Sequence, residues 1–375
     1  MANSTTYDIG RIADLSVVKR KEKNLTVDVY QQKRGYPAKY RIFSRNVVCY
    51  YHDKSIYNMK PSDIVQTVNV IEDYINKIGS IFNLKLPALN QGKRYALYLS
   101  NTGLHPEPGD CTNGVIGAGS EYVMMLHPDV INNIALDTTV IVHELGHGFF
   151  QVGGVNSWLE ESLCEYLTWF FVPSYQTFYD RTLAFVFQQS WVNPLSASNK
   201  DFGKRYNGAT IWSFIGHEFG HQRIGEIANN AWKTSSPQQP PQHDFERLAI
   251  YLKQDPKALA MRWAISCINL EFFSQDHQPF LKKFMAGRGL DKNTLAWNIA
   301  TFNYTPQVDM NPRTEVYGFE VSQPVTLDRP PKMPSQGNWL VRYLVLNNPK
   351  NKYDVFESPP PNAKQTQCRL LFVRV

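Results

Sequence analysis

Apolar positions in the first third of the chain follow two different periods, so this part is predicted to mix strands and helices. Short runs at Asn46–Tyr51, Arg94–Leu99 and Glu121–Leu126 are rich in apolar and aromatic residues, which is typical of β-strands. From Ser62 onward, isoleucine and valine recur every three or four residues. This spacing predicts an amphipathic helix with Ser62 as its N-cap, ending before Gly79.

The later parts of the chain differ in character. Helical spacing prevails from Tyr206 to about Phe302 and is interrupted by one proline- and amide-rich loop, SSPQQPPQHD. Further on, prolines alternate with β-runs, of which Asn338–Leu346 and Arg369–Val375 are the strongest. We therefore predict an α+β fold with three parts: a β-rich and mixed α/β part (1–155), a mainly helical part (156–304) and a small β domain (305–375).

Composition narrows the choice of partners. The chain has 375 residues, of which 43% are apolar, and 39 basic residues against 33 acidic ones give a net charge of +6. No segment concentrates basic residues with interleaved aromatics, so nucleic acid is not expected as a partner. No apolar run approaches the length of a membrane span.

The N-terminus and the cysteines bear on the compartment. MANSTTYDIG lacks a basic region followed by an apolar stretch, so we recognise no secretory signal. A cytoplasmic protein, leaderless export or a leader already removed would each fit. The cysteines are odd in number and form no CxxC pair, which favours a reducing environment. A single disulfide is the alternative. The cysteines are Cys49, Cys111, Cys164, Cys267 and Cys368.

The segment 137–151 is predicted as a helix and contains the HExxH motif His143-Glu144-Leu145-Gly146-His147. Side chains four residues apart lie on the same face of a helix, so both imidazoles can reach one tetrahedral metal ion. Glu144 follows the first histidine and is placed to act as general base on a water that the metal binds. An apolar stripe lies opposite the histidines: Ile141, Val142, Leu145 and Phe149.

A third metal ligand is expected in the next predicted helix, 157–171. Two adjacent glutamates compete for this role. Ser157 with Glu160 three residues later forms a capping box, which gives Glu160 a structural role at the helix start. Glu161 shares a helix face with Glu165, which lies four residues further on. We therefore predict Glu161 as the metal ligand and Glu165 as the carboxylate that orients a ligating imidazole.

At this point HELGH followed by WLEESLCEY resembles the gluzincin metallopeptidases, the clan that contains thermolysin and the aminopeptidase-N-like enzymes. Their second motif often reads Trp-Leu-x-Glu-x-x-Ala-x-Tyr. In this sequence Glu161 stands at the ligand position and Tyr166 at the tyrosine, whereas Cys164 replaces the small residue. The resemblance implies a zinc ion held by His143, His147 and Glu161. The short spacing between the two motifs implies a divergent family.

The resemblance also implies residues that contact the substrate. In the clan, an edge strand before the active-site helix binds the substrate backbone. The stretch Gly117–Leu126 stands at that place, with Gly119, Ser120 and Glu121 as candidate substrate-binding residues. A glycine-bearing loop is predicted from Thr102 to Gly119. A tyrosine or histidine from the helical part usually stabilises the oxyanion. Tyr206 is the candidate for this role, with a core tyrosine as the equally weighted alternative.

A second HExxH motif, His217-Glu218-Phe219-Gly220-His221, competes with the first. Its histidines also oppose an apolar stripe when the segment is drawn as one helix, so the helical pattern does not separate the two motifs. The third ligand does. Glu226 is too close in sequence, Glu246 follows a proline-rich loop, and Glu271 is the best remaining candidate. With Glu271, the motif is similar to the lethal-factor-like toxin peptidases. The first motif is preferred.

These observations predict a zinc metallopeptidase that hydrolyses a peptide or protein substrate. The aminopeptidase element Gly-x-Met-Glu-Asn is absent, which favours an endopeptidase. Two alternatives stay open. One is a catalytically silent module that binds zinc, protein or glycan, against which the intact Glu144 counts. The other is a toxin or effector peptidase that uses His217 and His221.

Overall fold

A computed structural model of the chain describes a little more than half of its residues. These are residues 8–11, 40–51, 60–84, 95–99, 114–118, 121–126, 130–131, 138–149, 157–176, 178–179, 208–230, 244–287, 301–302, 317, 319–322, 337–347, 352–361 and 368–375.

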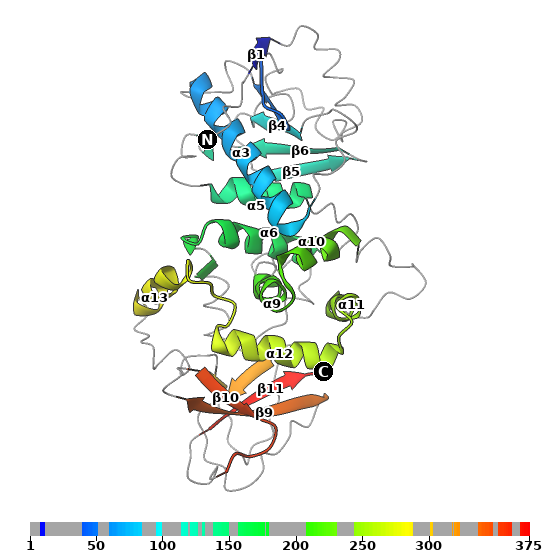
Figure 1. Cartoon of the computed structure of the whole chain (residues 1–375), viewed down its shortest axis with the longest axis vertical. Coiled ribbons are helices and arrows are strands. Elements are labelled where there is room, and N and C mark those ends of the chain that lie inside the picture. The colour runs from blue at the N-terminus through cyan, green and yellow to red at the C-terminus, as the bar shows by residue number, and fades with distance from the viewer. Residues whose placement is uncertain are drawn as a thin grey trace. The chain divides into compact units, whose positions relative to one another are not determined.

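The described residues form eight helices and eleven strands, so the predicted α+β class is confirmed (Figure 1). The helices are α3 (Pro61–Phe82), α5 (Thr139–Phe149), α6 (Ser157–Phe171), α9 (Ala209–Phe219), α10 (His221–Asn230), α11 (Asp244–Tyr251), α12 (Pro256–Asn269) and α13 (Gln278–Gly287). The strands are β1 (Asp8–Arg11), β2 (Tyr40–Phe43), β3 (Val47–Tyr51), β4 (Tyr95–Leu99), β5 (Gly114–Ala118), β6 (Glu121–Leu126), β7 (Thr301–Phe302), β8 (Phe319–Ser322), β9 (Trp339–Asn347), β10 (Lys352–Phe356) and β11 (Arg369–Arg374).

The chain divides into two compact units. Unit 1 comprises Met1–Gly153 and Phe170–Val172, and unit 2 comprises Gly154–Trp169 and Pro173–Val375. The three-part division expected from the sequence stays a prediction. None of the described helices is both long and apolar enough to cross a membrane.

Unit 1 is built on a six-stranded mixed sheet with the order β1-β2-β3-β4-β6-β5. Strands β3, β4 and β6 run parallel, and the remaining neighbours pair antiparallel. Helices α3 and α5 pack against the sheet and against each other (Figure 1). The predicted strands at β3, β4 and β6 are all present, because their apolar residues fill the interior beneath these helices.

The bounds of α3 differ from the prediction at both ends. Lys60 is the N-cap, Pro61 takes the first helical position, and the Asp63 carboxylate accepts a hydrogen bond from Lys60 N–H at 2.8 Å. Gly79 lies inside the helix, which ends instead at Asn83 in a left-handed conformation (φ 51°). Buried residues continue to Phe82, and the packing of these residues stabilises the helix beyond Gly79.

The edge of the sheet also differs from the prediction. The stretch Gly117–Leu126, expected as one edge strand, contains the end of β5 and the whole of β6, which pair as a hairpin. Strand β6 lies between β4 and β5, so β5 is the edge strand. Residues 114–118 had been expected in a glycine-bearing loop. They form a strand because Val115 and Ile116 pair with Met124 and Val123 of β6.

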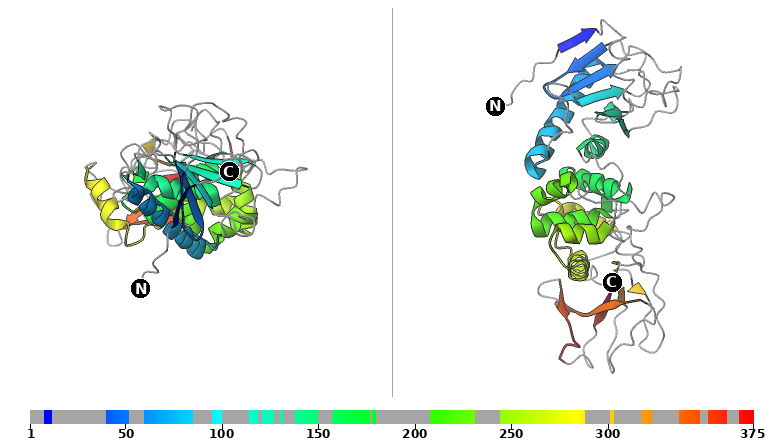
Figure 2. Two further views of the ribbon diagram at one scale, coloured as in Figure 1. Left: turned by 90° about the horizontal axis from the view of Figure 1, so that it is seen from above. Right: turned by 90° about the vertical axis from the view of Figure 1, so that its right-hand side faces the viewer.

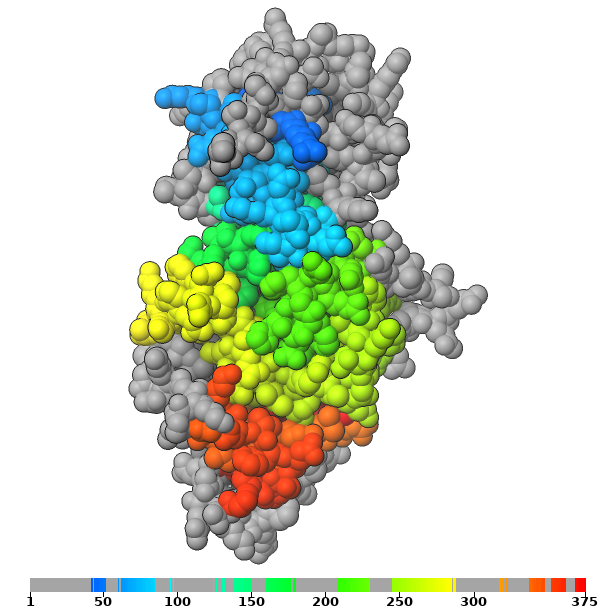
Figure 3. Space-filling view, viewed as in Figure 1, coloured from blue at the N-terminus to red at the C-terminus, as the bar shows by residue number. Residues whose placement is uncertain are grey.

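Unit 2 consists of helices followed by a C-terminal sheet. This five-stranded sheet has the order β10-β9-β11-β8-β7, with antiparallel pairs throughout except for β7 and β8. Helix α12 lies beside β10 and β11 (Figure 2). Trp263 of α12 meets Phe319 of β8 edge-on, with 5.6 Å between the ring centroids. In the space-filling view the orange and red strands lie directly beside the yellow-green helical part (Figure 3).

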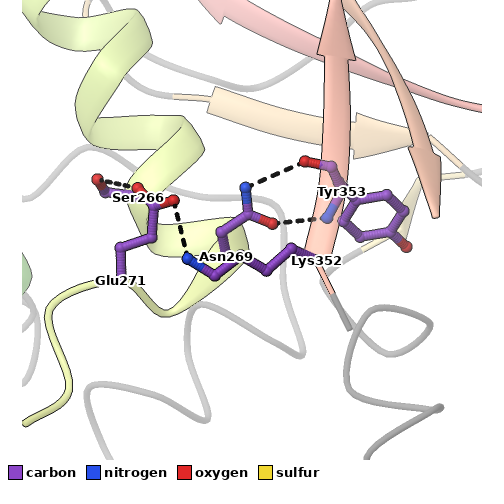
Figure 4. Close-up of polar contacts among 5 residues, drawn as sticks. All are labelled: Ser266, Asn269, Glu271, Lys352 and Tyr353. Atoms are coloured by element: carbon purple, nitrogen blue, oxygen red, sulfur yellow. Dashed lines mark hydrogen bonds and ion pairs between the residues drawn. The ribbon is translucent and has the colours of Figure 1, made fainter. Parts of the chain in front are cut away.

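Polar contacts join the end of α12 to strand β10 (Figure 4). The Asn269 side chain accepts a hydrogen bond from Tyr353 N–H at 2.8 Å and donates one to Tyr353 O at 3.3 Å. Beside it, Lys352 Nζ lies 3.4 Å from a carboxylate oxygen of Glu271, whose other oxygen accepts from Ser266. These contacts fix β10 at the end of the helix.

Candidate metal centre

Helix α5 places two histidines at its surface and an apolar stripe in the core of unit 1. His143 and His147 are half-buried, and their ring centroids lie 5.1 Å apart with the planes inclined by 73°. Tyr74 of α3 and Thr138 share a hydrogen bond of 3.0 Å between their hydroxyls, which fixes the start of α5. The stripe is buried as predicted: Ile141, Val142, Leu145 and Phe149.

Glu144 lies between the two histidines in sequence and is buried, with 9% of its surface exposed. Its neighbours in sequence are the half-buried His143 and the fully buried Leu145. A carboxylate with so little exposure to water is costly unless polar groups surround it. This burial gives Glu144 an environment different from that of a solvated helix face.

Helix α6 has the bounds predicted from the sequence. Glu160 lies in the first turn, where its negative charge interacts favourably with the partial positive charge of the helix N-terminus. Glu161 is half-buried and Glu165, one turn later, is 1% exposed. At the other end of α6, Phe170 and Phe171 belong to unit 1, where both rings pack edge-on against Phe82 of α3.

Three side chains converge to form the candidate centre. One ligand atom from each of His143, His147 and Glu161 lies within 4.8 Å of the other two. Within the described part of the chain, this is the one group of three such side chains that could hold a metal ion. Two imidazoles and a carboxylate form a donor set that suits zinc and leaves a coordination position for another group. The residues therefore fit a metal ion.

Glu165 has a partner that the sequence did not indicate. Tyr175, beyond the end of α6, donates a hydrogen bond from its hydroxyl to Glu165 Oε2 at 3.3 Å. The contact depends on the turn after Phe171, which returns the chain alongside α6. No spacing rule connects two such residues, so no pattern in the sequence could have revealed it. The predicted role of Glu165 in orienting an imidazole stays a prediction.

The second HExxH motif does not lie on one helix. Helix α9 ends at Phe219, Gly220 has a φ of +88°, and His221 begins α10. The single helical wheel drawn for this motif was therefore wrong. Only glycine adopts such a φ at low cost, and this residue breaks the helix between the two histidines.

His217 and His221 have different surroundings. His217 is exposed, whereas His221 is half-buried and its Nδ1 lies 3.1 Å from the hydroxyl of Tyr166. The pKa of His221 is lowered, first by burial and then by the charge of His217. Burial also raises the pKa of Tyr166, so this pair is neutral at ordinary pH.

The carboxylates considered as third ligands for the second motif have other partners. Glu246 accepts a hydrogen bond from Tyr317 at 2.6 Å, and Glu271 binds Ser266 and Lys352. Glu226 forms an ion pair with Arg223 on its own helix. Among the described residues, none of these carboxylates joins His217 and His221 in a group that could hold a metal.

Three of the predicted site residues lie outside the described residues: Tyr206, Gly119 and Ser120. Glu121 is described by its backbone alone. It begins β6 and pairs with Ala118 of β5, at the closed end of the hairpin. The roles predicted for these four residues stay predictions.

Comparisons with known proteins do not identify a family for this chain. No protein-family model matches the chain, and no curated protein matches it significantly. Among solved structures it is similar to a mutant of a functionally unknown conserved protein from Bacillus anthracis str. Ames, at 12% sequence identity and a TM-score of 0.36. The match covers 90% of this chain and spans 62% of that protein's length.

Proposed function

We propose that this chain is a zinc-dependent peptidase, with its reaction centre at His143, His147 and Glu161. The observation that supports this most is the convergence of these three side chains, two from one helix turn of α5 and one from α6. Their chemistry matches the set of two histidines and one glutamate used by catalytic zinc sites.

The metal would be held by the two imidazoles and the Glu161 carboxylate. When bound, zinc supplies a Lewis acid that polarises a carbonyl group. Glu165, buried one turn beyond Glu161 and bound by Tyr175, is proposed to accept the second N–H of a ligating imidazole, which fixes the ring's orientation.

Glu144 is proposed as the general base. Its carboxylate would take a proton from the attacking water and pass that proton to the nitrogen of the leaving amine. Tyr206 is proposed to stabilise the negative oxygen that develops on the scissile carbonyl.

The proposed substrate is an extended stretch of a peptide or protein. Strand β5 is the edge of the unit 1 sheet and contacts α5, the helix that carries both histidines. Its outer backbone groups suit the addition of a substrate strand, and Gly119, Ser120 and Glu121, which follow β5 in the sequence, are proposed to contact this strand. Binding along an edge strand fits cleavage within a chain, which is why we favour an endopeptidase.

The test is hydrolysis of fluorogenic peptides of mixed sequence by the zinc-loaded protein and by its Glu144→Gln variant. We expect hydrolysis by the wild type and a loss of at least about 100-fold in the variant, which should retain its zinc. Glu218→Gln makes the same change in the second HExxH motif and should leave hydrolysis unchanged.

Three results would count against the proposal. Wild-type protein that carries one zinc and hydrolyses nothing would favour a metal-binding module instead. Loss of hydrolysis in Glu218→Gln alone would move the reaction to the second motif. Loss of both metal and fold in Glu144→Gln would mean that Glu144 has a structural role.

A further inference from the structure

Gly148 occupies a position on α5 where the helical pattern calls for a side chain. It comes three residues after Leu145 and seven after Ile141, so it belongs to the apolar stripe that packs into the core. A glycine inside a helix costs about 0.5–1 kcal/mol relative to alanine. This glycine also directly follows His147. A specific contact must therefore explain it.

The contact is with the phenol ring of Tyr95, the first residue of β4. A Cβ atom added to Gly148 would lie 3.0 Å from Cζ and 3.2 Å from Cε2 of this ring, and closer still to its hydroxyl. Favourable carbon contacts are about 3.5–4.0 Å long. Tyr95 is 1% exposed. The phenol thus fills the place of the missing side chain, and the α5 backbone rests directly on the ring.

Polar contacts hold Tyr95 in this position. Its N–H donates to Asn46 O at 2.6 Å. Asn46 in turn donates to the carboxylate of Glu72 on α3, from its backbone N–H at 3.0 Å and its side-chain amide at 2.6 Å. Ser44 donates to the same carboxylate at 2.5 Å, and Glu72 is 7% exposed. Because three donors satisfy this buried carboxylate, the start of β4 is fixed to α3.

We propose that Tyr95 is a positioning residue for the metal centre: its ring sets how closely the last turn of α5 approaches the sheet and so places His147. Gly148 and His147 are consecutive, so the backbone cannot move at one without moving the other. Metal ligands must be placed to within about 0.2 Å. A methyl group at position 148 would push the helix outward by more than this. The inference rests on the proposed metal site, whereas the contact itself does not.

The first test is Gly148→Ala, measured by competition between the protein and a chromophoric chelator for zinc. We expect affinity to fall by about 10-fold or more, the range seen when groups behind metal ligands are altered. The visible spectrum of the Co²⁺-loaded variant should differ from that of the wild type. Gly79→Ala on α3 is the matched control, since its Cβ would meet only Leu84 O, at 3.2 Å. It should change thermal stability without changing affinity or spectrum.

The second test is rescue. Tyr95→Leu combined with Gly148→Ala gives the added methyl group room, so this pair should bind zinc more tightly than Gly148→Ala alone and regain the wild-type Co²⁺ spectrum. Wild-type affinity in Gly148→Ala, or no gain in the pair, would overturn the inference. If Gly148→Ala does not fold, the pair should; a pair that also fails to fold would overturn it equally.

Failure of the metal site would be recognised separately. Wild-type protein that binds neither Zn²⁺ nor Co²⁺ would contradict the proposed function. The melting temperatures of the metal-free single and double variants would then still report whether positions 95 and 148 are coupled.

Discussion

Tyr166 and His221 join α6 to the start of α10 through a hydrogen bond of 3.1 Å between Oη and Nδ1. Gly216 of α9 lies against both groups, because a Cβ there would come within 2.7 Å of the Tyr166 hydroxyl and 2.8 Å of His221 Nδ1. Trp212 of the same helix donates to Ser162 of α6 at 2.9 Å. The second HExxH motif thus contributes a histidine that links three helices of unit 2.

This link predicts different outcomes for histidines of the two motifs. His221→Ala should lower the free energy of unfolding by about 1–3 kcal/mol, because it leaves a buried hydroxyl without this partner. It should keep about one zinc per chain, whereas His147→Ala should lose the metal. Metal content measured by atomic emission and melting curves of both variants provide the check. Loss of metal from His221→Ala with retention in His147→Ala would reverse the assignment of the site.

Substitutions of the two adjacent glutamates of α6, Glu160 and Glu161, should affect zinc affinity differently. Glu161→Gln is expected to weaken zinc binding by more than about 10-fold, because it removes a charged ligand. Glu160→Gln should leave affinity unchanged and cost about 0.3–1 kcal/mol of stability, through loss of a negative charge at the helix start. Chelator competition on both variants measures this. Equal loss of affinity in the two would show that the choice of Glu161 from the capping box was mistaken.

His277 should make unit 2 sensitive to acid. It is 4% exposed, its ring lies 3.9 Å from that of Trp169, and its nitrogens contact Ser274 and the Trp169 carbonyl. Burial lowers its pKa below the usual 6.5, while the Trp169 carbonyl and Asp276 act in the opposite direction without reversing the shift. The unfolded chain therefore binds the proton more readily, so stability is lost as pH falls below about 6.5.

The pH dependence can be measured with His277→Gln, which cannot take up a proton. Between pH 7.5 and 5.5, its melting temperature should fall less than that of the wild type, even if it starts lower. Parallel curves for the two proteins would mean that His277 does not titrate between the folded and unfolded states.

The cysteines should be unreactive in the folded protein. In the described part of the chain, Cys49, Cys164, Cys267 and Cys368 are buried and form no disulfide with one another. Burial raises the pKa of the Cys49, Cys267 and Cys368 thiols, which suppresses the reactive thiolate. A chromogenic disulfide reagent at pH 8 should therefore label a Cys111→Ser variant only after denaturation. Rapid labelling without denaturant would contradict this.

The sequence predicted best the elements that are governed by periodicity alone. Helix α6 was predicted with the bounds that it has, and α5 contains the two histidines of the HExxH spacing, as predicted. The third ligand needed one more step, the assignment of Glu160 to the helix start. Glu161 does lie with the two histidines in a group that could hold a metal, because neighbouring residues on a helix face different directions, and its role as a ligand stays a prediction.

Glycines explain most of the differences. Gly79 was taken as a helix end, yet burial of the residues beyond it extends α3. Gly220 was drawn inside a helix, yet its positive φ ends one. The glycines of β5 suggested a loop, but this segment forms a strand because it pairs with β6. Each outcome depends on contacts with distant residues, which local spacing does not contain.

The contact between Asn269 and Tyr353 has a consequence for how molecules of this protein meet one another. Strand β10 lies at the edge of the C-terminal sheet, and edge strands can recruit strands from other molecules. The Asn269 side chain forms hydrogen bonds with both the N–H and the carbonyl of Tyr353, as a neighbouring strand would. The charged Lys352 stands next to it, held by Glu271. This edge is therefore protected against intermolecular pairing, and the sheet is less able to seed aggregation during folding or storage.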